Sequence, residues 1–131
     1  MIRKDEMESL ERTNPIDLTI RLREEPDARE YRFRLVAGAG QVMDGSTLPD
    51  PEAALAALER YGQDIFFPQP GPPKLCTQQY GGPQVALVTG TFHGREVNAK
   101  FQRTDGCEIA RWKALAPLLG GTAGATANSW K

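Results

Sequence analysis

Apolar and polar residues alternate over two stretches in the first third of the chain. The alternating apolar positions are Leu18, Ile20, Leu22, Tyr31, Phe33 and Leu35. A period of two is typical of strands that bury one face and expose the other. Residues 24–29 between them contain Pro-Asp, which signals a turn. We therefore expect an antiparallel pair of strands near 17–23 and 31–35.

Helical spacing replaces this alternation over residues 51–61. The apolar positions with that spacing are Ala54, Leu55, Leu58 and Tyr61. Asp50 is a typical N-cap residue, and Pro51 suits the first helical position. Gly62 follows the last apolar position, where glycine commonly ends a helix. The pattern predicts a helix over 51–61 that stops at Gly62.

The second half of the chain predicts a hairpin and a further helix. Residues 84–92 are rich in Val, Leu and Thr, and His93-Gly94 suits a tight turn before a return strand that extends to residue 101. Helical spacing resumes after Cys107 and is strained near Pro117. Because strands and helices do not alternate, the fold class is α+β, with four to five antiparallel strands and two helices.

The composition fits one globular domain. The chain has 131 residues, of which 40% are hydrophobic, and a formal net charge of −1. We place the domain at residues 15–119, between a flexible leader (1–14) and a disordered tail (120–131). Without a net basic face, nucleic-acid binding is not expected. The chain has no run of about 18 apolar residues, so no membrane span is expected. The leader lacks the apolar core of a signal peptide.

The reactive side chains do not form a catalytic or metal-binding pattern. The chain has two cysteines, Cys76 and Cys107, and one histidine, His93. Two cysteines are compatible with one disulfide, whereas a zinc site would lack ligands. A Cys76–His93 dyad would lack a third, orienting group, and Gly38-Ala39-Gly40 lacks the last glycine of a dinucleotide fingerprint. We expect no enzyme activity, no cofactor and no metal.

One stretch has no such simple explanation. Residues 74–83 read Lys-Leu-Cys-Thr-Gln-Gln-Tyr-Gly-Gly-Pro and follow a segment, 65–73, that holds four of the ten prolines. Prolines cannot lie inside a sheet and stiffen an extended chain. The sequence thus predicts an exposed, presented loop.

The order and spacing of several motifs resemble the Streptomyces subtilisin inhibitor-like family. The matching segments are Cys76-Thr77-Gln78-Gln79-Tyr80, Pro83-Gln84-Val85, Gly90-Thr91-Phe92-His93-Gly94-Arg95-Glu96-Val97 and Cys107-Glu108. They look like the family's Cys-Thr-x-x-Tyr-x-Pro-Val segment, its Gly-x-aromatic-x-Gly-Arg-x-Val hairpin and its closing cysteine. The resemblance covers about residues 16–112, and its specific part lies within 75–108.

The resemblance implies a five-stranded antiparallel sheet with two helices and inhibition of subtilisin-type serine proteases. The reactive bond would be Gln78–Gln79, within a protease-binding loop that also includes Leu75, Cys76, Thr77 and Tyr80. A Cys76–Cys107 disulfide would hold this loop, with Tyr80 and Pro83 supporting it after the bond. The resemblance also implies a secreted protein and a homodimer formed through the sheet.

Departures from the family pattern keep other functions open. Ala37 and Leu55 stand where the family has a second disulfide, so apolar packing would replace that bond. Gly81-Gly82 stands where the family has a single residue, which would loosen the loop. A cytoplasmic relative that acts as a non-inhibitory protein-binding module is the alternative. Gln78 or Gln79 could also serve as a transglutaminase acyl donor.

Overall fold

The computed structural model describes residues 16–72 and 74–119. The strands are β1 (Ile16–Arg23), β2 (Glu30–Gly38), β3 (Gln41–Val42), β4 (Val85–Phe92) and β5 (Arg95–Phe101). The helical elements are α2 (Pro51–Ala57), the π-helical turn η1 (Leu58–Gly62), α3 (Gln63–Phe66) and α4 (Gly106–Ala114). The expected leader and tail lie outside the described residues.

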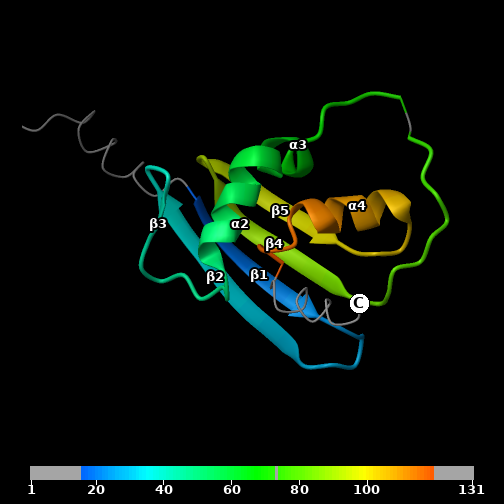
Figure 1. Ribbon diagram of the computed structural model, residues 1–131, viewed down its shortest axis with the longest axis horizontal. Coiled ribbons are helices and arrows are strands. Elements are labelled where there is room, and N and C mark those ends of the chain that lie inside the picture. Colours follow the sequence, from blue (N-terminus) through cyan, green and yellow to red (C-terminus); the bar gives the residue numbers. More distant parts are fainter. Residues whose placement is uncertain (1–15, 73, 120–131) are drawn as a thin grey trace, which may run out of the picture.

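The described strands form one antiparallel sheet in the order β3-β2-β1-β4-β5. Because α2, η1 and α3 follow one another without a break, the sheet is accompanied by two helical segments (Figure 1). This architecture confirms the expected α+β class. The short edge strand β3 is not among the strands that the hydrophobic pattern assigned to particular residues.

The alternating apolar residues of β1 explain why it is the central strand. Leu18, Ile20 and Leu22 are at most 1% exposed and belong to one core cluster. In register, Leu18 lies opposite Leu35 of β2, so the two strands bury the same face. The helices lie over that face (Figure 1), and their buried residues Leu58 and Trp112 join the cluster. Burial of this apolar surface is the main term that holds the helices to the sheet.

The prediction that Gly62 ends the first helix is wrong. Gly62 has helical dihedrals, φ −60° and ψ −42°, and the chain continues as α3 to Phe66. A Cβ atom at Gly62 would lie 2.9 Å from Cζ of Phe92 and 3.2 Å from Cδ2 of Leu58. Glycine is therefore required here for the close approach of the helix to β4, rather than for a left-handed stop.

The β4–β5 hairpin turns as expected at His93-Gly94. His93 has φ 52° and Gly94 has φ 82°, and Phe92 pairs with Arg95 across the turn. Two consecutive positive φ values define the turn type whose twist suits a hairpin. His93 is therefore a turn residue, as its neighbour Gly94 predicted.

Helix α4 begins earlier than the sequence predicted. Asp105 is its N-cap, and one carboxylate oxygen accepts a 2.9 Å hydrogen bond from the Glu108 N–H. The helix ends at Ala114, before Pro117, and the following turn buries Leu115 and Leu118 in the core. Cys107 is thus the second residue of a helix rather than a residue that precedes it.

The opposite face of the sheet is covered by ion pairs in place of helices. Glu30 bridges Arg21, Arg23 and Arg32 at 3.0–3.3 Å, and Arg34 pairs with Asp17 at 2.8 Å. The hydrogen bond from Arg21 is the main cause that lowers the pKa of Glu30. The arginines therefore form a solvated face, as expected. Within the ranges 16–72 and 74–119, no helix is long and apolar enough to span a bilayer.

Candidate functional site

The chain between α3 and β4 forms a long arc outside α4 (Figure 1). Residues 74–80 are all exposed. Leu75 is 101% exposed and Tyr80 is 67% exposed, although both side chains are largely apolar. The structure therefore places all the predicted loop residues on one accessible segment.

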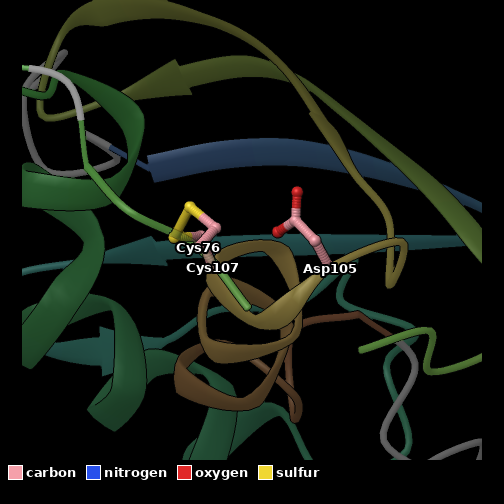
Figure 2. Close-up of side chains that lie close together, drawn as sticks. All are labelled: Cys76, Asp105 and Cys107. Atoms are coloured by element: carbon pink, nitrogen blue, oxygen red, sulfur yellow. A yellow bond between two sulfur atoms is a disulfide. The ribbon is translucent and has the colours of Figure 1, made fainter. Parts of the chain in front are cut away.

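A disulfide joins this arc to the start of α4. Cys76 is bonded to Cys107, with their Cα atoms 5.3 Å apart. Figure 2 shows the bond at the first turn of the helix, beside the carboxylate of Asp105. Because Asp105 caps the helix through the Glu108 N–H, the segment that carries Cys107 is itself fixed. The disulfide thus anchors the loop to a rigid element.

Two backbone hydrogen bonds add to this anchor. The Gly106 N–H donates to the Thr77 carbonyl at 2.9 Å, and the Gly81 N–H donates to the Arg103 carbonyl at 2.7 Å. The two bonds lie on either side of Gln78, Gln79 and Tyr80, whose side chains are exposed. The short segment 103–107 therefore holds the loop both before and after the Gln78–Gln79 bond.

The first of the two glycines after Tyr80 lies close to α4. A Cβ atom at Gly81 would lie 2.8 Å from Cδ1 of Ile109 on α4, so the backbone is in close contact with the helix. Tyr80 and Pro83 are both exposed. The hydrogen bond from the Gly81 N–H to the Arg103 carbonyl is a point of support after the Gln78–Gln79 bond that the sequence did not predict.

The reactive side chains near the loop already have structural roles. Cys76, Asp105 and Cys107 bring their ligand atoms within 4.8 Å of one another, a spacing that could suit a metal ion. The two sulfur atoms are bonded to each other, and Asp105 caps α4. The same bond leaves Cys76 without the thiol that a Cys76–His93 dyad would need.

The positions of the family's second disulfide are apolar and buried. Ala37 is 1% exposed and Leu55 is 5% exposed, and both belong to the core cluster. Apolar packing occupies the place that the resemblance assigns to a covalent bond. The only cross-link within the described residues is therefore the one beside the loop.

A scan against protein-family models and a search of curated proteins each returned no match for this chain. The case for its function consequently depends on the geometry of the loop and on the motifs within it.

Sequence reasoning missed the residues that hold the loop, namely Arg103, Asp105 and Gly106. One signal was available, because Asp105 and Glu108 have the spacing of an N-cap residue and an acidic N3 residue. That pattern would have started α4 at Gly106 and placed Cys107 in its first turn. The carbonyl of Arg103 has no equivalent signal in the sequence.

Proposed function

We propose that the protein inhibits subtilisin-type serine proteases by presenting residues 75–80 as a substrate-like segment with Gln78–Gln79 as the reactive bond. One observation carries the proposal: the exposed bond lies between two backbone hydrogen bonds and beside a disulfide, all to the segment 103–107. The family resemblance of the motifs supports the same conclusion.

The physical reason concerns entropy and the fate of the cut bond. A serine protease binds an extended strand and attacks one carbonyl next to its oxyanion donors. A strand that is already held loses little conformational entropy on binding. After cleavage, the disulfide at Cys76 and the hydrogen bond at Gly81 would keep both new ends in place. Religation then competes with release, so that turnover is slow.

The exposed side chains define the class of protease. Gln78 would enter the primary specificity pocket, and its long uncharged side chain suits a broad subtilisin pocket better than one that requires a cation. Leu75, three residues earlier, would fill a hydrophobic subsite, and burial of its side chain would contribute roughly 1.5–3 kcal/mol. Full exposure of Leu75 in the free protein makes this whole area available to the enzyme.

Incubation with subtilisin tests the proposal directly. We expect stoichiometric inhibition, with only slow cleavage at Gln78–Gln79 by mass spectrometry. Gln78→Pro should abolish inhibition and leave the thermal unfolding midpoint unchanged, because Gln78 is exposed. Gln69→Pro is the matched control, since residue 69 lies in the same exposed arc outside the held stretch. Rapid cleavage without inhibition would contradict the proposal and favour a non-inhibitory binding module.

We further propose that two copies associate through the helix-free face of the sheet. This face carries both signs of charge, from Arg21 and Arg34 to Asp17 and Glu30, so a twofold arrangement can pair unlike charges. Sedimentation equilibrium should then give twice the chain mass. The double variant Thr19→Glu/Thr89→Glu should be a monomer, because it adds like charges to neighbouring strands. A monomeric parent protein would exclude the dimer.

The proposed activity places the protein outside the cell. Secreted proteases are its targets, and a disulfide such as Cys76–Cys107 persists in an oxidising environment. Detection of the oxidised protein in culture medium would support this location, whereas a cytoplasmic protein with free thiols would contradict it.

A further inference from the structure

Two buried polar atoms lie without hydrogen-bond partners among the described residues. They are Oε1 of Gln84 and Nε of Arg103. Buried polar atoms are nearly always paired, and each exception calls for a reason such as stored strain or a functional role. Oε1 of Gln84 is an acceptor, and Nε of Arg103 is a donor.

Both side chains lie against the same pair of glycines. A Cβ atom at Gly81 would come within 3.2 Å of Cβ of Arg103, and one at Gly82 would collide with Oε1 of Gln84. Gly82 has φ 131°, a conformation that favours glycine. The glycine pair is therefore fitted between Arg103 and Gln84 on the side of the loop that follows Gln78–Gln79.

Arg103 has a second connection to the loop. Its carbonyl accepts the hydrogen bond from the Gly81 N–H, and its guanidinium lies 6.0 Å from the centre of the Trp112 ring. Trp112 is 6% exposed and belongs to the core. Arg103 thus links the loop backbone to the core of the domain. A substitution of the Arg103 side chain should therefore alter the hydrogen bond between the Arg103 carbonyl and the Gly81 N–H.

We propose that Gln84 and Arg103 are positioning residues for the loop, which fix Gly81–Gly82 and so keep the cut segment that begins at Gln79 in place. The inference rests on the proposed function and deepens it. Apolar side chains of similar size would fill the same space without the cost of desolvating an unpaired polar group. Two unpaired buried polar atoms are therefore not explained by fold stability, which fits a role in positioning the loop.

This gives a test that separates positioning from stability. Gln84→Leu and Arg103→Met should each leave the thermal midpoint unchanged or raise it. Each should nevertheless speed subtilisin cleavage at Gln78–Gln79 at least tenfold and increase amide exchange at Gly81. Arg111→Met is the matched control, because Arg111 covers Phe101 from α4, 4.4 Å from the ring centre.

The outcomes are distinct for the two proposals. If the parent protein fails to inhibit subtilisin, the proposed function is wrong, but amide exchange at Gly81 still reports on positioning. The positioning inference is overturned if exchange and cleavage are unchanged in both variants, or if they change only in proportion to lost stability. If one variant does not fold, the same comparison with the other decides the question.

Discussion

The Gly106 N–H donates a hydrogen bond to the Thr77 carbonyl. Cys107, which follows Gly106, is disulfide-bonded to Cys76, which precedes Thr77. The loop and the start of α4 are therefore joined twice, by Cys76–Cys107 and by Thr77–Gly106. A Cβ atom at Gly106 would collide with Oγ1 of Thr77, which explains the glycine. Two adjacent connections restrict rotation of the loop in a way that a single disulfide would not.

Removal of the disulfide should weaken the fold and loosen the loop. The bond closes a loop with a sequence separation of 31 residues, and in the chain-entropy model this contributes roughly 3.5–4 kcal/mol to the free energy of unfolding. We expect Cys76→Ser/Cys107→Ser to lose about that much in urea titration. Cleavage at Gln78–Gln79 by subtilisin should become fast.

The control for this variant is the parent protein treated with a dithiol reductant. It should show the same loss of stability and the same fast cleavage as the double variant. A double variant that is as stable and as slowly cleaved as the parent protein would show that Thr77–Gly106 and Gly81–Arg103 hold the loop without covalent help.

The close packing of Gly62 predicts that alanine is harmful there. In an exposed helix, Gly→Ala usually adds about 1 kcal/mol of stability. Here the new methyl group would meet the Phe92 ring at 2.9 Å, and Phe92 is 2% exposed and packs edge-on against Phe66. Overpacking typically costs about 1–3 kcal/mol, which equals or exceeds the gain of about 1 kcal/mol in helix propensity, so we expect a net loss of up to roughly 2 kcal/mol.

Chemical denaturation of Gly62→Ala measures this loss, and Gly71→Ala is the matched control. A Cβ atom at Gly71 would meet nothing within 4 Å, so that variant should keep the parent stability. A stabilised Gly62→Ala would mean that helix propensity outweighs the contact with Phe92.

The sequence was sufficient for elements whose signals are local. The alternation in β1 and β2 and the turn at His93-Gly94 are both set by residues adjacent in the chain. The structure contains both strands and the predicted turn. Gly62 shows where local signals fail, because the same glycine can end a helix or admit a ring from a distant strand. Phe92 lies 30 residues later, and nothing near Gly62 indicates its approach.

The loop illustrates the same limit. Its exposure could be predicted from the prolines and glycines around residues 74–83, which are local features. Its attachment to the domain could not be predicted, because it depends on the carbonyl of Arg103 and the N–H of Gly106. Every residue other than proline carries the same backbone N–H and C=O groups, so the sequence does not indicate which of them will pair. Gly81 and Gly82 therefore suggested a loose segment, whereas the backbone at Gly81 lies close to Ile109.

The side chain of Leu75 should matter for binding and not for folding. It is fully exposed in the free protein, so Leu75→Ala should leave the thermal midpoint unchanged. In the complex the lost apolar contact should weaken inhibition of subtilisin roughly tenfold to a hundredfold, since 1.4 kcal/mol is a factor of ten. Met43→Ala, an exposed apolar residue after β3, serves as the control. Equal inhibition by both variants would remove Leu75 from the contact surface.

The Glu30 cluster predicts how stability changes in acid. The hydrogen bond from Arg21 lowers the pKa of Glu30 below its ordinary value of 4.5, so the folded state binds this proton less readily than the unfolded state. The stabilising contribution is therefore complete above about pH 4.5 and is lost as the pH falls through the lower, folded-state pKa. Urea midpoints of Glu30→Gln should accordingly fall less steeply between pH 5 and 3 than those of the parent protein. Equal slopes for Glu30→Gln and the parent protein would show that the three arginines do not favour the ionised carboxylate of Glu30.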